Sequence, residues 1–263
     1  MNIEMINIID WLRVNKLSLN LKKTHFVIFR RNRSKPLIDK DLIIDGVKID
    51  MVDKTKFLGV IVDKHLSFYD HVNYMKGKVS RGLGILYKTR RLVNQSTLAT
   101  LYNSFIYPYL NYCILIWGNT CQSYIQPLIT IQKRAIRLIK GAQRLDHSDP
   151  LFKELRILKI REIYVYSLQQ LMFKHHHELL PDTFSDFFKP NNQYHDYDTR
   201  QSKLLHIPLY TTKQTSVSIR KAGVTCYNYF DSRLDIHCTI MTYKRRLKNI
   251  FWKMKFHLCF SKY

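Results

Sequence analysis

The spacing of apolar residues changes near residue 66, and this change constrains the fold more than any other feature of the chain. Before it, apolar residues form the short runs and alternations typical of strands, at residues 26–29, 42–49 and 57–62. After it, they recur every three or four residues, as amphipathic helices require; the first series is Val72, Met75, Val79, Leu83 and Leu86. The sequence therefore predicts an α+β chain whose strands all lie in its first quarter.

Local signals refine the first part. A helical spacing over residues 3–14 precedes the first strand, and Asp45-Gly46 predicts a tight hairpin turn within a small antiparallel sheet. A basic loop is expected at residues 30–36. In the first long helix, three glycines each lower helix stability by about 1 kcal/mol relative to alanine, so packing must stabilise it; they are Gly77, Gly82 and Gly84.

The rest of the chain is expected to be helical. Ser96 is the predicted N-cap of the next helix, Pro108 its kink, Gly141 the stop of a later one, and Asp149-Pro150 the cap and first residue of a short one. A loop-rich connection covers residues 182–214. The expected helices lie at residues 98–109, 123–140, 160–172, 216–231 and 240–256.

Charge points to a polyanionic partner. The 263 residues include 43 Lys and Arg against 20 Asp and Glu, a formal charge of +23 and a pI near 9.8. Nucleic acid fits better than a membrane, because the cations are spread along the whole chain. Residues 92–132 carry no charge, but polar residues and proline interrupt them, so we expect a buried core segment there and no membrane span.

The cysteines and the first residues indicate the compartment. Five cysteines without a Cys-x-x-Cys pair are typical of reduced thiols, and the start of the chain lacks the basic region of a secretory signal. We expect an intracellular protein, in the nucleus or cytoplasm, whose oligomeric state stays open.

Six motifs follow one another along the chain. They are Trp11…Asn15-Lys16-Leu17…Lys23-Thr24, Phe57-Leu58-Gly59-Val60…Asp63, His71-Val72, Leu101-Tyr102…Ser104…Pro108…Tyr112 with Trp117-Gly118, Gln132-Lys133-Arg134-Ala135…Arg137, and His195…Thr199-Arg200. In type and order they resemble the closing part of the reverse transcriptase of LINE-type (non-LTR, jockey-like) retrotransposons, from about residue 9 to about residue 250. Near the end the match is looser, since the family's Trp-Asn-x-Leu-Pro is replaced by Tyr227-Asn228-Tyr229-Phe230.

The resemblance implies a domain organisation and a partner. Residues 1–66 correspond to the C-terminal part of the polymerase palm, residues 67–181 to a helical thumb, and residues 182–263 to a loop-rich linker with basic C-terminal helices. RNA, DNA or their hybrid is the implied partner. In the family, the catalytic turn with two adjacent aspartates lies upstream of the tryptophan, and only ten residues precede Trp11 here.

Catalysis is not expected from this chain alone. Two-metal polymerisation needs carboxylates that hold two Mg²⁺ ions about 3.5–4 Å apart, and no two acidic residues are adjacent in the sequence. We expect no metal site and no cofactor, with Mg²⁺ needed only by the complete polymerase. By resemblance, Lys23 matches the lysine that approaches the departing pyrophosphate, and Phe57-Leu58-Gly59 the turn that positions the primer. The alternative for Lys23 is an exposed lysine without a catalytic role, and the alternative for Phe57-Leu58-Gly59 is an ordinary buried strand.

Other possible metal ligands have simpler explanations. Asp39 and Asp41 lie in a basic loop, and the histidines at 175–177 point about 100° apart on a helix, so they cannot converge on one ion. Turn and capping roles are expected for Asp63, His65, Asp70 and His71.

Nine cations of the helical part are candidate phosphate ligands without obvious base readout. They are Lys78, Arg81, Lys88, Arg90, Arg91, Lys133, Arg134, Arg137 and Lys140. Each could singly be a solvated side chain, but the charge of +23 argues against that for all of them. Two other interpretations stay open: an active polymerase whose reading frame extends further upstream, and a repurposed basic helical module that binds a protein or chromatin.

Overall fold

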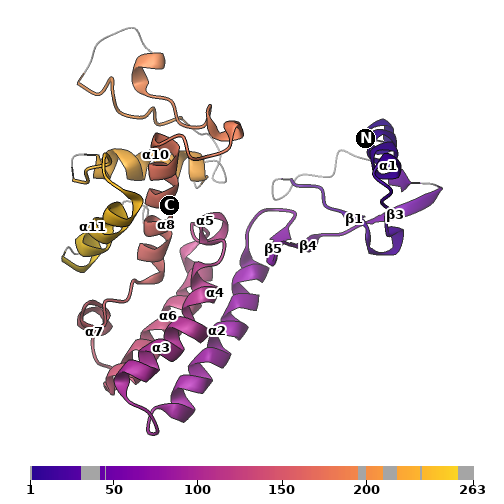
Figure 1. The fold of residues 1–263 in the computed structure, drawn as a ribbon. Helices are drawn as coiled ribbons and strands as arrows, with labels where there is room; N and C mark the ends of the chain where they lie inside the picture. Colours follow the sequence, from indigo (N-terminus) through magenta and orange to yellow (C-terminus); the bar gives the residue numbers. More distant parts are fainter. Residues whose placement is uncertain are drawn as a thin grey trace. The chain divides into compact units, whose positions relative to one another are not determined.

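A computed structural model describes residues 2–30, 42–44, 46–194, 200–209, 218–231 and 233–253. It divides into two compact units, Met1–His71 and Val72–Tyr263 (Figure 1). The expected basic loop from residue 31 onward, Asp39, Asp41 and the motif from His195 to Thr199 lie outside the described residues. The domain boundaries expected after residues 66 and 181 stay predictions.

The first unit packs one helix on a small mixed sheet. Helix α1 (Asn2–Val14) is followed by a 3-10 turn (Leu21–Lys23) and by the strands β1 (His25–Phe26), β2 (Leu42–Ile44) and β3 (Val47–Met51). The strand order is β1-β3-β2. Its core consists of Leu42, Ile44 and Ile49, against which Met5, Ile9, Leu21 and Phe26 pack.

The pairing of this sheet confirms one expectation and corrects two. Ile44 lies opposite Val47 in the antiparallel β2–β3 pair, so the predicted two-residue turn is confirmed, with Gly46 at φ +76°. However, β1 runs parallel to β3, and it ends at Phe26 instead of residue 29. The reason is that the following segment pairs elsewhere: the Arg30 amide donates to the Lys64 carbonyl at 2.9 Å.

A separate hairpin completes the first unit. Strands β4 (Lys54–Phe57) and β5 (Val60–Asp63) pair antiparallel, so the single strand expected at residues 57–62 is wrong. Leu58 and Gly59 both adopt left-handed backbone conformations, φ 44° and 85°, and reverse the chain between them. His25 Nε2 and Thr55 Oγ1, 2.6 Å apart, tie β1 to β4.

The remaining helices follow the predicted periodicity closely. They are α2 (Tyr69–Thr89), α3 (Gln95–Phe105), α4 (Tyr107–Asn111), α5 (Ile114–Trp117), α6 (Gln122–Lys140), α7 (Ser148–Glu154), α8 (Ile160–His176), α10 (Ile219–Phe230) and α11 (Ile240–Lys253), with short 3-10 turns at Asp182–Phe184 and Asn191–Gln193. Gly141 closes α6 at φ +65°, as expected.

Several helix boundaries differ from expectation, three of them at residues predicted to cap or kink a helix. Asn94, not Ser96, caps α3, because its side chain accepts the Thr97 amide at 2.9 Å. Around Pro108 the chain breaks into two helices, α3 and α4, where a kink was expected. Helix α7 begins at Ser148, one residue before the predicted cap Asp149.

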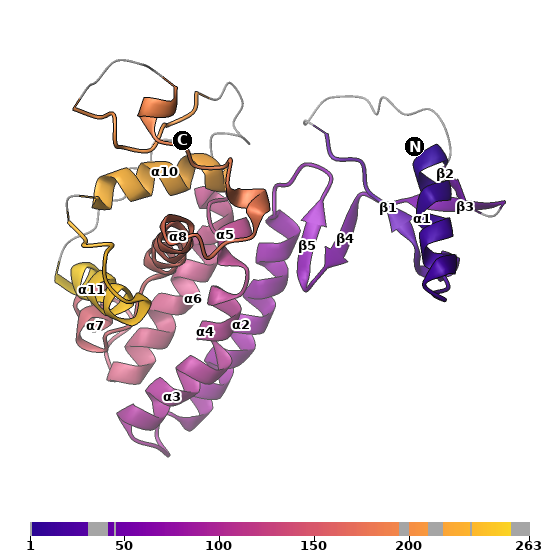
Figure 2. The ribbon, with the colours of Figure 1, turned by 45° about the horizontal axis from the view of Figure 1, so that its top comes forward.

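Two fully buried glutamines join the helices of the second unit, in which α8 packs against α4, α5, α6, α10 and α11 (Figure 2). Gln132 of α6 donates to the Tyr102 hydroxyl and the Leu158 carbonyl and accepts the Ile160 amide, at 2.9–3.0 Å. Gln169 of α8 accepts the Tyr243 hydroxyl at 2.7 Å and donates to the Cys226 sulfur of α10. Sequence reasoning missed both roles.

Gly82 has a packing role that its helix propensity hides. A Cβ at this position would lie 2.7 Å from the Phe105 carbonyl oxygen, so only glycine lets α2 approach the end of α3 this closely. Within the described residues, none of the helices combines the length and apolar character needed to cross a bilayer.

Candidate nucleic-acid interface

The tip of the β4–β5 hairpin exposes two large apolar side chains. Phe57 is 66% exposed and Leu58 73%, so the alternative of an ordinary buried strand is wrong. Leu58 also holds a left-handed backbone, which costs a non-glycine residue about 1–2 kcal/mol. The tip of the hairpin thus presents apolar side chains on a turn whose backbone is strained.

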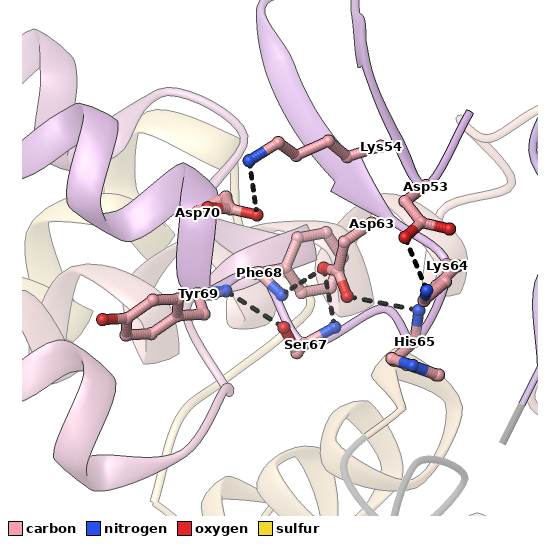
Figure 3. A network of polar contacts seen from close by, with 9 residues as sticks. All are labelled: Asp53, Lys54, Asp63, Lys64, His65, Ser67, Phe68, Tyr69 and Asp70. Atoms are coloured by element: carbon pink, nitrogen blue, oxygen red, sulfur yellow. Dashed lines mark hydrogen bonds and ion pairs between the residues drawn. The ribbon is translucent and has the colours of Figure 1, made fainter. Parts of the chain in front are cut away.

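The carboxylate of Asp63 holds the turn that leads from this hairpin into α2 (Figure 3). Its Oδ1 accepts the amides of Ser67 and Phe68, both at 2.9 Å, and its Oδ2 accepts the amide of His65 at 3.2 Å. Burial acts to raise the pKa of Asp63, but the backbone donors together outweigh it, and the pKa is lowered. The expected turn role of Asp63 is confirmed.

Ion pairs engage the other carboxylates around this turn. Lys64 lies 2.6 Å from Asp53, and Lys54 lies 3.2 Å from Asp70 (Figure 3). The described part of the chain holds no cluster of three His, Cys, Asp or Glu side chains able to bind a metal ion.

His71 joins the hairpin to α2. It is fully buried, and its Nδ1 lies 3.3 Å from the Ile61 amide, from which it accepts a hydrogen bond. Burial lowers its pKa to about 4, because the charged form loses its solvation. The histidine of the His71-Val72 motif is thus a neutral acceptor inside the first unit, and not a cap.

The motif around Trp11 builds the end of α1 and the turn into β1. The Asn15 side chain donates to the Trp11 carbonyl at 2.8 Å, and the Thr24 hydroxyl donates to the Asn20 carbonyl at 2.9 Å. Lys23 is exposed in the 3-10 turn that precedes β1. The contact between His25 and Thr55 then joins β1 to β4. The catalytic role of Lys23 stays a prediction.

One face of α2 combines small residues with cations. Its inner side carries the buried residues Val72, Met75, Val79 and Leu86. On the opposite side, four exposed residues follow one another at intervals of three and four, and exposed cations flank them. We call six of these residues the α2 surface: Asn73, Gly77, Ser80, Gly84, Arg81 and Lys88.

The nine expected phosphate ligands differ in how the fold engages them. Lys78 and Arg90 lie over the rings of Tyr74 and Tyr87, at 5.5 and 3.6 Å from the centroids. Four others are exposed, namely Arg81, Lys88, Arg91 and Arg134, and Lys133 is half-buried.

Two of the nine connect α6 to the segment that follows it. Arg137 donates to the Asp146 carbonyl at 2.8 Å, and Lys140 forms an ion pair with Glu154 of α7. These contacts hold α7 and the preceding loop against α6. We therefore expect Arg137 and Lys140 to contribute less to phosphate binding than the exposed cations of α2.

The three consecutive histidines each contact a different segment. His175 Nε2 lies 3.1 Å from the Phe188 carbonyl oxygen, and His177 Nε2 lies 2.9 Å from that of Ile236, while the ring of His176 lies beside that of His237. Burial and the neighbouring histidines lower the pKa of His176. The cluster connects the end of α8 to later parts of the chain.

A cavity of about 640 Å³ lies beside the end of α8. Its lining includes the carboxylates of Glu178, Asp182 and Asp186. Lys189 also lines it and pairs with Asp186, which leaves two carboxylates without this cation. Their negative charge disfavours a polyanion, so we do not include this cavity in the candidate interface.

The motifs and the comparison with curated proteins agree on a class: the chain resembles a region of LINE-type reverse transcriptases. It is 27% identical over 155 residues to the probable RNA-directed DNA polymerase from transposon X-element of Drosophila melanogaster, a match covering 57% of this chain and 17% of that protein. The match to the probable RNA-directed DNA polymerase from transposon BS of the same species is 26% identical, over 58% of this chain and 17% of that protein.

A third relative is the RNA-directed DNA polymerase from mobile element jockey of Drosophila funebris, 21% identical over 52% of this chain and 15% of that protein. The matches thus span 17% or less of the length of these relatives. No family model matches the chain. Nor does any solved structure.

Proposed function

We propose that this chain is the part of a retrotransposon RNA-directed DNA polymerase that holds template and primer. In this proposal the first unit is the end of the palm, and the helices that follow form the thumb and a basic C-terminal extension. The 263-residue chain binds RNA, DNA or their hybrid without reading its sequence, and it does not polymerise. All three relatives are named as RNA-directed DNA polymerases, and this supports the polymerase part of the proposal.

The α2 surface carries the proposal. Apart from the adjacent residues and the backbone of the helix itself, no described atom would lie within 4 Å of a Cβ at Gly77 or at Gly84, so packing does not explain either glycine. Each costs the helix about 1 kcal/mol relative to alanine. Arg81 and Lys88 lie exposed along the same row, which gives it a positive charge.

A bound phosphate backbone would account for both the exposed glycines and the positive charge of this row. Glycine lets another backbone come close to the helix, as it does in phosphate-binding loops. The neighbouring arginine and lysine would then contact successive phosphates, without any contact to base edges. The exposed hairpin tip at Phe57 and Leu58 would contact the primer strand.

A triple variant tests the α2 surface together with Arg91, the exposed cation that follows the helix: Arg81→Gln, Lys88→Gln and Arg91→Gln, titrated against a fluorescent RNA–DNA hybrid. We expect the dissociation constant to rise at least tenfold, and the slope of its logarithm against the logarithm of salt to fall by about 3, one unit for each lost phosphate contact. The matched control removes three exposed cations elsewhere, Arg144→Gln, Lys174→Gln and Lys203→Gln. If the control loses as much affinity as the variant, the α2 surface is not the interface.

The absence of catalysis is tested separately. The purified chain is incubated with a primed RNA template, deoxynucleotides and Mg²⁺, and we expect no extended primer. Extension above the level of a heat-denatured sample would contradict this part of the proposal. Tight binding to an acidic protein together with no affinity for the hybrid would instead favour the basic interaction module.

A further inference from the structure

Helix α11 carries a second cationic surface. None of the nine candidate phosphate ligands described above belongs to it. Its buried row consists of Tyr243, Leu247 and Phe251, which face the core beside α8. The adjacent, half-buried row places Lys244, Lys248 and Trp252 four residues apart, and Arg245 is exposed next to it.

Helix α11 carries a local excess of positive charge. The segment Ile240–Lys253 contains five cations and no acidic residue. Arg246 pairs with Asp235 at 2.8 Å. Lys244 and Lys248 are a like-charged pair four residues apart, an arrangement that costs a helix a few tenths of a kcal/mol. A negatively charged ligand would remove this repulsion.

Trp252 ends the cationic row, and an arginine from another part of the chain lies over it. The Arg156 guanidinium carbon is 5.6 Å from the Trp252 ring centroid. Arg156 follows α7 in a left-handed conformation, φ 53°, where glycine is the usual residue. Beside this pair, Lys248 Nζ lies 5.4 Å from the ring centroid of Tyr166 on α8.

We propose that these residues bind single-stranded nucleic acid, and we call them the α11 surface: Arg156, Lys244, Arg245, Lys248 and Trp252. The lysines and Arg245 contact successive phosphates, and an unpaired base stacks against Trp252 and Arg156. A cationic row that meets an aromatic ring is how proteins hold single strands without sequence preference. A duplex hides its base faces, so it cannot use the tryptophan, and this separates the α11 surface from the α2 surface.

Two variants of the full chain test the proposal by anisotropy with a 16-nucleotide single strand and with an RNA–DNA hybrid. In Lys244→Gln, Arg245→Gln, Lys248→Gln, we expect single-strand affinity to fall at least tenfold and hybrid affinity to change no more than in the Arg144, Lys174, Lys203 control. In Trp252→Leu, we expect single-strand affinity alone to fall, by about fivefold or more, since stacking contributes about 1–3 kcal/mol per base.

The outcomes separate this proposal from the function proposed above. If both ligands lose affinity equally in the α11 variants, or if Trp252→Leu binds the single strand like the unaltered chain, the α11 surface is overturned while the α2 surface stands. Ultraviolet cross-linking of a 4-thiouridine strand to the unaltered chain covers the case of a misfolded variant. Cross-links within residues 240–253 or at residue 156 are expected, and their absence there would overturn the proposal.

Discussion

Gln132 is a single buried residue that joins several parts of the second unit through its hydrogen bonds. Replacing it by leucine would leave the Tyr102 hydroxyl, the Leu158 carbonyl and the Ile160 amide buried without this partner. Each such group costs about 1–3 kcal/mol, so we expect Gln132→Leu to lower the free energy of unfolding by about 3 kcal/mol or more. Urea denaturation followed by circular dichroism measures it.

The control for this change lies on the same helix. Gln126 is exposed, and Gln126→Leu should change stability by no more than about 0.5 kcal/mol. A Gln132 variant as stable as this control would show that the buried hydrogen bonds of Gln132 contribute little.

His71 makes the first unit sensitive to acid. Because its folded pKa is about 4, below the unfolded value of about 6.5, the native state favours the neutral ring. The stability from the neutral ring is fully present above pH 6.5 and is lost progressively as the pH falls through 4. Hydrogen exchange of residues 54–63 at pH 7 and pH 5 should show lower protection at pH 5.

The His71→Gln variant should lose most of this pH dependence, whereas His147→Gln, which removes an exposed histidine, should retain it. Equal pH dependence in both variants would contradict the role of His71.

Among the elements, α2 shows a conflict between stability and contact. Since a Cβ at Gly77 or Gly84 would meet no described atom beyond the adjacent residues and the helix's own backbone, the change of both to alanine should raise the free energy of unfolding by about 1–2 kcal/mol. The added methyl groups would keep a phosphate backbone at a distance, so we expect hybrid affinity to fall. A thermal melt and a hybrid titration on the same sample measure both effects, and a more stable variant with unchanged affinity would contradict the role of the glycines.

The β4–β5 hairpin makes a parallel case. Asparagine tolerates the left-handed backbone of position 58 better than leucine, so Leu58→Asn should stabilise the hairpin by about 1 kcal/mol. It also removes an apolar side chain that is 73% exposed. If this side chain contacts the primer strand, hybrid affinity falls despite the gain in stability; a variant that binds as well as the unaltered chain would rule this contact out.

The helices could be predicted because apolar residues at intervals of three and four form their buried sides, as in α2, α6 and α8. The hairpin at Leu58-Gly59 could not, because leucine is not a residue that favours a positive φ. The parallel pairing of β1 depends on β3, more than 20 residues away in sequence. The roles of Gln132 and Gln169 were hidden because their partners come from other helices.

The candidate site could be predicted from the sequence only in part. Net charge and motif order indicate the cations of α2 and α6, but only the packing of α7 shows that Arg137 and Lys140 have partners within the chain. The small-residue face of α2 is present in the sequence as Asn73, Gly77, Ser80 and Gly84 at helical spacing. Its exposure, and hence its availability to a ligand, follows only from the structure.

At the scale of the whole molecule, the charge of +23 and the resemblance to RNA-directed DNA polymerases lead to one expectation: the chain holds nucleic acid through its phosphates. The measurement that tests this most directly is an anisotropy titration of the chain with an RNA–DNA hybrid at several salt concentrations. We predict binding at low salt, and a dissociation constant whose logarithm rises linearly with the logarithm of salt, by about 0.9 for each phosphate contacted. No binding at low salt, or an affinity that salt leaves unchanged, would contradict the account.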